Sequence, residues 1–139
     1  MLLSSEWMNT RTLLSYWLIS LGLLTAGSFV PFSGIIHNFF MIDTILHLFL
    51  CGSVSFISMI LFRKRKTAFL LSFAVTPFGY LLEIFHSFLS GDGFNALNAM
   101  ANNAGVLAGI AAGFLLRLKN HYLRSENKSV TQKGGGRDE

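Results

Sequence analysis

The stretch IDTILHLFLCGSVSFISMILFRKRK, residues 42–66, decides the fold class of this chain. Its apolar part, residues 42–62, reaches the roughly 20 residues that a helix needs to cross a bilayer. Because lipid offers the peptide backbone no hydrogen-bond partners, such a segment is predicted to be helical. The four basic residues that follow at once are typical of the cytoplasmic end of a transmembrane helix.

Three further apolar stretches, at residues 13–30, 67–90 and 97–118, are separated from each other by polar residues. The chain is 52% hydrophobic and 13% charged, against about 25% charged in an ordinary soluble domain. Its mean hydropathy of +0.52 also excludes a typical soluble protein. We therefore predict an all-α integral membrane bundle of four transmembrane helices, formed by residues 1–118.

The basic residues predict how the bundle is oriented. Of the eleven Lys and Arg residues, Arg11 precedes the first helix, four lie between the second and third, and the others begin at Arg117. The two remaining loops, residues 31–41 and 91–96, contain none. Since cytoplasmic loops collect Lys and Arg, both termini are predicted to be cytoplasmic. The net charge of +4 then follows from topology and gives no reason to expect nucleic-acid binding.

The two ends of the chain need separate interpretation, because the N-terminal segment could be a signal peptide and the C-terminal segment lies outside the predicted bundle. Arg11, the apolar run after it and the TAGS sequence at residues 25–28 approximate a cleavable signal peptide. The apolar run continues to Val30, longer than the usual signal core, which favours a retained helix. Residues 119–139 are polar and glycine-rich, and we expect them to form a disordered cytoplasmic tail.

Three pairs of polar residues interrupt the apolar segments, each pair spaced to share one helix face. In chain order they are Asp43 and His47, Glu83 and His86, and Asn98 and Asn102. Because successive helices run in opposite directions, the three pairs should meet at one depth in the outer half of the membrane. Asn95, just before the fourth helix, should lie at the same level. The sequence thus predicts an outward-facing polar pocket centred on Glu83, His47, Asn102 and Asn98.

The fourth helix carries a face of small residues. Gly105, Gly109 and Gly113 repeat every four residues, a pattern that lets helix backbones approach closely in membranes. Asn98 and Asn102 continue this face by steps of four and three residues. The face that packs inward is therefore expected to carry the asparagines.

Two residues inside the predicted helices call for structural interpretations. Cys51, the one cysteine of the chain, is expected to be a small packing residue. Pro77 is expected to bend the third helix below Glu83 and to free a backbone carbonyl.

These motifs together resemble the VanZ-like family of small bacterial membrane proteins. The resemblance covers residues 42–116, with the matching positions in the order Asp43-x-x-x-His47, Glu83, a Gly-rich turn with Phe94, and Asn102-x-x-Gly105-x-x-x-Gly109. It implies a protein of the bacterial cytoplasmic (inner) membrane with a role in the cell envelope. The family is named after a protein associated with teicoplanin resistance, so the resemblance also implies antibiotic tolerance.

The chain departs from the family pattern at four positions. Thr44 replaces a lysine, His86 a glutamine, Asp92 an arginine, and Asn98 an aspartate. The loss of the lysine and the arginine makes the outer site less cationic than the resemblance implies. An anionic ligand is therefore not carried over from the family.

Several chemistries remain open for the pocket. Glu83 could act as a general acid or base with His47 or His86, while asparagines stabilise a developing oxyanion. Asp43, His47, Glu83 and His86 could alternatively hold a divalent metal ion. Whether the protein is an enzyme is left open at this stage.

Binding without chemistry is the third possibility, with Asp43, Asn95, Asn98 and Asn102 as ligand contacts. The ligand would be a membrane lipid or a lipid-linked cell-wall precursor entering from the outer leaflet.

A structural lock, with Glu83 paired to a histidine or an asparagine, is the alternative. Interhelical hydrogen bonds average about 0.6 kcal/mol, whereas a charge at the bilayer centre costs about 2.5 to 3.5 kcal/mol. Structure alone is thus a weak reason for the carboxylate. Transport is disfavoured, because four helices leave little room for a path unless the chain forms a homo-oligomer, and because the single polar cluster lies on one side only.

Overall fold

The computed structural model describes residues 9–29, 40–91 and 93–134 of the 139-residue chain. These residues form four α-helices: α1 (Thr10–Phe29), α2 (Phe40–Leu61), α3 (Arg65–Ser90) and α4 (Ala96–Gly134). All four are long and apolar enough to cross a membrane, which confirms the predicted all-helical membrane protein. Most of the predicted 31–41 loop and the turn residue Asp92 lie outside the described residues.

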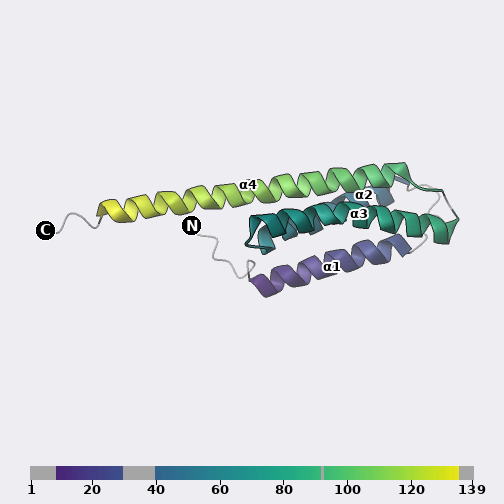
Figure 1. The fold of residues 1–139 in the computed structure, drawn as a ribbon, viewed down its shortest axis with the longest axis horizontal. Coiled ribbons are helices and arrows are strands. Elements are labelled where there is room, and N and C mark those ends of the chain that lie inside the picture. Colours follow the sequence, from purple (N-terminus) through teal and green to yellow (C-terminus); the bar gives the residue numbers. More distant parts are fainter. Residues whose placement is uncertain (1–8, 30–39, 92, 135–139) are drawn as a thin grey trace.

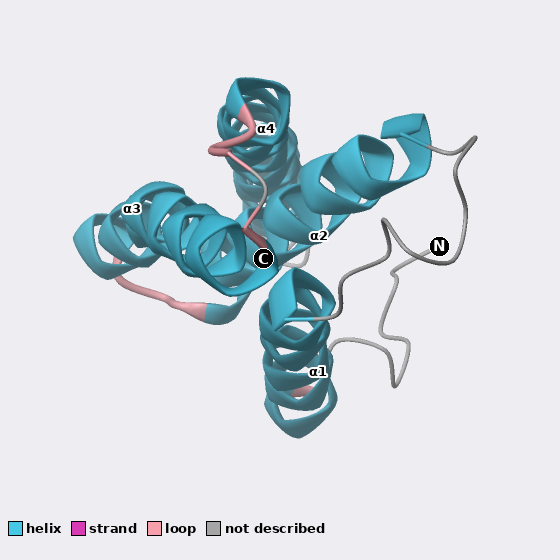
Figure 2. Cartoon of the chain, turned by 90° about the vertical axis from the view of Figure 1, so that its right-hand side faces the viewer, coloured by secondary structure: helices cyan, strands magenta, loops and turns pink. Residues whose placement is uncertain are grey.

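The helices alternate in direction along the chain, so α1 and α3 end where α2 and α4 begin (Figure 1). We call this the polar end of the bundle. The opposite end holds the α2–α3 turn with its basic residues 63–66, and we call it the basic end. Seen end-on, the helices surround a common centre, with α2 between α1 and α4 (Figure 2).

The closest helix contact joins α2 and α4 along the predicted glycine face. A Cβ atom on Gly105 would collide with the backbone oxygen of Leu48, and one on Gly109 with that of Gly52. Gly52 faces back, since a Cβ there would lie 3.2 Å from the Gly105 oxygen. Such spacing leaves room only for hydrogen atoms between the backbones and permits Cα–H···O contacts. The glycines therefore fix the register of α4 on α2.

Hydroxyl groups join α2 to its other neighbours. The single Ser72 hydroxyl proton of α3 is shared between the Ser55 carbonyl at 3.0 Å and the Ala68 carbonyl of its own helix at 2.8 Å, and Ser55 donates to the Ser72 carbonyl at 3.3 Å. The indole Nε1 of Trp17 on α1 donates to Ser58 Oγ at 2.8 Å. At the basic end, Arg117 Nη2 donates to two carbonyl oxygens after α2, each at 2.8 Å. In a medium without water, these bonds satisfy groups that would otherwise be costly to bury.

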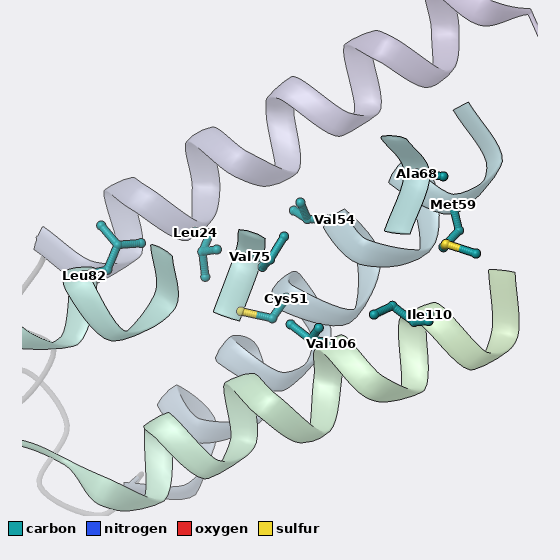
Figure 3. Packing of buried hydrophobic residues seen from close by; sticks show 9 residues of the cluster. All are labelled: Leu24, Cys51, Val54, Met59, Ala68, Val75, Leu82, Val106 and Ile110. Carbon is teal, nitrogen blue, oxygen red and sulfur yellow. The ribbon is translucent and has the colours of Figure 1, made fainter. Parts of the chain in front are cut away.

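The apolar core runs along the centre of the bundle. Its buried side chains come from all four helices and include Leu24, Val54, Val75 and Val106 (Figure 3). Large apolar side chains such as Phe88, at 85% exposure, point away from this core. In a membrane protein, an outward apolar surface of this kind faces lipid.

Helix α3 contains Pro77 and ends at Gly91. The helix continues through Pro77, and the predicted bend there stays a prediction. Gly91 adopts φ = 74°, a left-handed conformation that glycine reaches without the strain of a side chain. Its N–H donates to the Ser87 carbonyl, which closes the end of the helix.

The structure differs from the sequence prediction in the region after residue 118. Residues 119–134, expected to be part of a disordered tail, continue α4 as far as Gly134 beyond the other helices (Figure 1). No proline or glycine interrupts this region before Gly134. Extending an existing helix is much less costly than nucleating one, so polar residues prolong α4 despite having no apolar face. Residues 135–139 lie outside the described residues.

We expect Gly105→Ala to destabilise the bundle by about 1–3 kcal/mol, because its methyl group meets backbone atoms that cannot rotate away. Thermal unfolding of the detergent-purified protein measures this effect. Gly22→Ala on α1 is the matched control, since a Cβ there meets nothing within 4 Å. Equal melting temperatures for the two variants would contradict the proposed close contact.

Candidate functional site

The polar end contains a narrow recess that is too tight inside to admit a water molecule, with about 150 Å³ of space when its open mouth is included. All four helices contribute to its lining, which consists of Gly27, Ser28, Asp43, His47, Glu83, His86 and Asn98. Four of the predicted pocket residues are nearly inaccessible, with exposures of 6% for His47, 1% for Glu83, 2% for Asn98 and 0% for Asn102. Helix α1, which sequence reasoning could not assign to the pocket, contributes Gly27 and Ser28.

Asp43 and Asn98 connect the first turns of α2 and α4. Asn98 Nδ2 donates to Asp43 Oδ2 at 2.6 Å, while Thr44 Oγ1 donates to Asn98 Oδ1 at 2.7 Å. The amide is therefore oriented by one acceptor and one donor on α2. Thr44 and Asn98 are both departures from the family pattern, and here they bond to each other. The Asp43 side chain keeps 35% of its surface exposed.

His47 is held from both sides one turn deeper. Its Nδ1 lies 3.1 Å from Asn102 Oδ1, and its Nε2 lies 3.6 Å from Asp43 Oδ1. Asn102 Oδ1 also accepts the Cys51 thiol at 3.2 Å. Since an amide oxygen only accepts, His47 donates its Nδ1–H to it. The His47 Nε2 is then the atom that faces Asp43 and the recess.

The other side of the Asn102 amide has no partner. Its Nδ2 is buried without a hydrogen bond, next to α3 at Gly79. A Cβ on Gly79 would lie 3.0 Å from that nitrogen, so glycine leaves the space in which the amide sits. Asn102 is thus fixed by its oxygen, while its nitrogen is an unsatisfied donor between α3 and α4.

Glu83 is bound to the start of α4. Its Oε1 accepts the backbone N–H of Asn95 at 3.1 Å. The Asn95 side chain in turn caps α4, because its Oδ1 accepts the N–H groups of Leu97 and Asn98 at 3.1 and 3.3 Å. Asn95, expected to contact a ligand, therefore has a capping role. Within the described part of the chain, Glu83 makes no ion pair.

His86 faces α1. Its Nδ1 lies 2.7 Å from the Ser28 carbonyl oxygen. Because a carbonyl oxygen can only accept, His86 donates its Nδ1–H to it. In a neutral ring, the Nε2 atom then carries the lone pair. The Ser28 hydroxyl donates to the Leu24 carbonyl within α1 at 2.9 Å. This histidine therefore connects the ends of α1 and α3.

The metal site considered from the sequence is not assembled. Across residues 9–29, 40–91 and 93–134, no three His, Cys, Asp or Glu side chains are close enough to hold one metal ion. The reason is that Glu83 is directed to the Asn95 backbone and His86 to the Ser28 carbonyl. The pairing of Glu83 with His47 or His86, considered as part of the alternative structural lock, is not formed among the described residues.

The one cysteine of the chain is also not placed to act as a nucleophile in covalent catalysis. Cys51 is fully buried and donates its S–H to Asn102, not to His47. A nucleophile needs an adjacent base and access to substrate, and Cys51 has neither. The Asp43–His47 pair on the recess wall is the arrangement that could move a proton.

Sequence reasoning missed three contributors to the site, namely Gly27, Ser28 and Gly79. Ser28 enters through its backbone carbonyl, which any residue type supplies, so no sequence signal marks it. Gly79 has no side chain and so leaves room for the Asn102 amide. Its position four residues before Glu83 places it on the same helix face, which the sequence alone could have indicated.

We expect Asn102→Ala to destabilise the protein by about 1–3 kcal/mol, because His47 and Cys51 lose a buried acceptor. Asn103→Ala is the neighbouring control, since that amide donates to the Tyr80 hydroxyl at an exposed position. Chemical or thermal unfolding in detergent compares the two. A larger loss for Asn103→Ala would show that the Asn102 bonds contribute little.

Glu83→Gln should melt at the same temperature as the wild type or higher. Glutamine keeps an oxygen for the Asn95 N–H and removes a buried charge that has no ion pair in the described structure. Asp43→Asn should melt lower, because it weakens a 2.6 Å bond to Asn98 and the interaction with His47. A marked loss of stability in Glu83→Gln would mean that the carboxylate locks the helices together.

The site is a hydrogen-bonded polar cluster with one buried carboxylate, enclosed by four apolar helices. No family model, curated protein or solved structure matches this chain. What the protein does must therefore be argued from the recess and its chemistry.

Proposed function

We propose that the chain is a VanZ-like protein of the bacterial cytoplasmic membrane. Its recess binds the headgroup of an outer-leaflet lipid or lipid-linked cell-wall precursor, and this binding contributes to tolerance of glycopeptides such as teicoplanin. The observation that carries the proposal is the Glu83 carboxylate, which is 1% exposed and lines the recess without an ion pair in the described structure.

A purely structural role explains Glu83 poorly. A carboxylate in a membrane helix is costly, and such residues are rare outside functional sites. The Asn95 backbone N–H that Glu83 accepts could be satisfied equally well by a neutral glutamine. Since the charge adds no ion pair within the described residues, a ligand is the better reason for keeping it.

The location of the recess favours a membrane-derived ligand. It opens at the polar end, where α1 and α3 finish, and its walls carry exposed apolar side chains such as Ile84 and Phe88 on the outside. A lipid could therefore place its acyl chains along the helices and its headgroup in the recess. The lack of Lys and Arg in residues 12–62 and 67–116 supports placing this end outside the cytoplasm.

The family resemblance supports the cell-envelope role. Asp43, His47, Glu83 and Asn102, which match the VanZ-like pattern, all line the recess or bond to a residue that lines it. A family pattern that concerned packing alone would not select the polar side chains of one recess. Binding is favoured over thiol-based catalysis, because Cys51 is fully buried and donates its S–H to Asn102. The Asp43–His47 pair favours acid–base chemistry as the second candidate.

The proposal is tested by expressing the protein in a teicoplanin-susceptible bacterium and measuring the minimum inhibitory concentration. We expect the wild type to raise it, and Glu83→Gln to lose this effect at equal abundance in the membrane, because the ligand loses its charged partner. Glu126→Gln, on the exposed extension of α4, should behave as the wild type. Full tolerance with Glu83→Gln, or no tolerance with the wild type, would refute the proposed role.

A further inference from the structure

The charges at the polar end have one sign. Residues 12–62 and 67–116 contain no Lys or Arg, so the Lys and Arg residues of the described segments lie at the basic end or on the α4 extension. The recess is lined instead by the carboxylates of Asp43 and Glu83 and by two histidines. The Glu83 side chain makes no ion pair among the described residues.

The donor groups on the recess lining already donate inside the protein, whereas the unpaired Nδ2 of the buried Asn102 lies beside Gly79, outside that lining. His47 and His86 donate their Nδ1–H groups to Asn102 Oδ1 and to a backbone carbonyl. The Ser28 hydroxyl donates within α1, and the Asn98 amide nitrogen donates to Asp43. The groups left to face a ligand are acceptors. They are the carboxyl oxygens of Asp43 and Glu83.

A site of this kind selects a ligand that is cationic, rich in donors and small. A primary ammonium group carries three N–H donors and one positive charge, which matches the unpaired acceptors and the negative charge of the recess. A quaternary ammonium has the charge but no N–H donor to offer these acceptors. A phosphate would meet two carboxylates.

From these observations we propose that the recess recognises a primary ammonium group, with Glu83 as its charged partner. This inference rests on the proposed function and names the chemistry of its ligand. The group could be borne by an aminophospholipid headgroup or by a soluble amine. The phosphate of such a lipid would stay at the mouth of the recess, outside the two carboxylates.

The test titrates the detergent-purified full chain with phosphatidylethanolamine, phosphatidylcholine and phosphatidylglycerol carrying identical acyl chains. We expect phosphatidylethanolamine to bind at least about tenfold more tightly than the other two, the difference made by one charge-assisted hydrogen bond. Glu83→Gln should abolish this preference, and Asp43→Asn should reduce it. Glu126→Gln, far from the recess, should retain it.

The alternative outcomes separate the two proposals. Tighter binding of phosphatidylcholine or phosphatidylglycerol that still depends on Glu83 would overturn ammonium recognition and leave the lipid-binding function standing. Binding of all three lipids without any dependence on Glu83 would overturn both. Free ethanolamine is the competitor that distinguishes the sources. Displacement of phosphatidylethanolamine by it supports a soluble amine as a sufficient ligand, and failure to displace supports the lipid-borne amine.

Discussion

The contact between the backbones of α2 and α4 determines the rest of the structure. Gly105 and Gly109 lie so close to the α2 carbonyl groups of Leu48 and Gly52 that neither helix can rotate or slide without a collision. In a bilayer, where lipid is as apolar as the helix surfaces, close packing of this kind replaces hydrophobic burial as the force between helices. The register that the glycines impose extends along the same face of α4 to its polar residues. It places Asn102 against His47, and Asn98 against Asp43.

Helix α3 is positioned at both ends by different means. Toward the basic end, the reciprocal Ser55 and Ser72 bonds hold it to α2. At the polar end, Glu83 accepts the N–H of Asn95, the residue that caps α4. The carboxylate thus reaches the recess through a contact with a helix start, where the aligned peptide dipoles also favour negative charge. A ligand that pulled on Glu83 would act on the start of α4 as well.

Much of this arrangement could be predicted from the sequence, because in a membrane it follows from length and periodicity. Four apolar stretches of sufficient length had to be helices, and pairs spaced by three or four residues had to share faces. The inward face of α4 followed from its glycines. These regularities place Glu83, His47 and Asn102 at one end without any knowledge of contacts.

What could not be predicted depends on rotation of helices about their axes and on backbone groups. A few degrees decide whether Glu83 and His86 converge on one ion or separate toward Asn95 and Ser28, and spacing alone does not specify them. The capping role of Asn95 was likewise hidden, since an asparagine before a helix suits a cap or a ligand equally. The helical state of residues 119–134 was not predicted, because their polar composition indicates only that the segment can bury little apolar surface. Continuation of α4 from an already formed helix needs little burial.

The polar cluster divides into groups that hold the fold and groups that are free for a ligand. Asn102 is fully buried and its oxygen satisfies two donors on α2, so it belongs to the packing even though its nitrogen has no partner. Asn98 and Asn95 are similarly committed, one to Asp43 and the other to the α4 cap. Glu83 differs, because a neutral side chain could accept its one backbone N–H and its charge is left without a partner in the described residues. The hydrogen bonds of the asparagines around Glu83 would therefore hold the helix ends together without its charge.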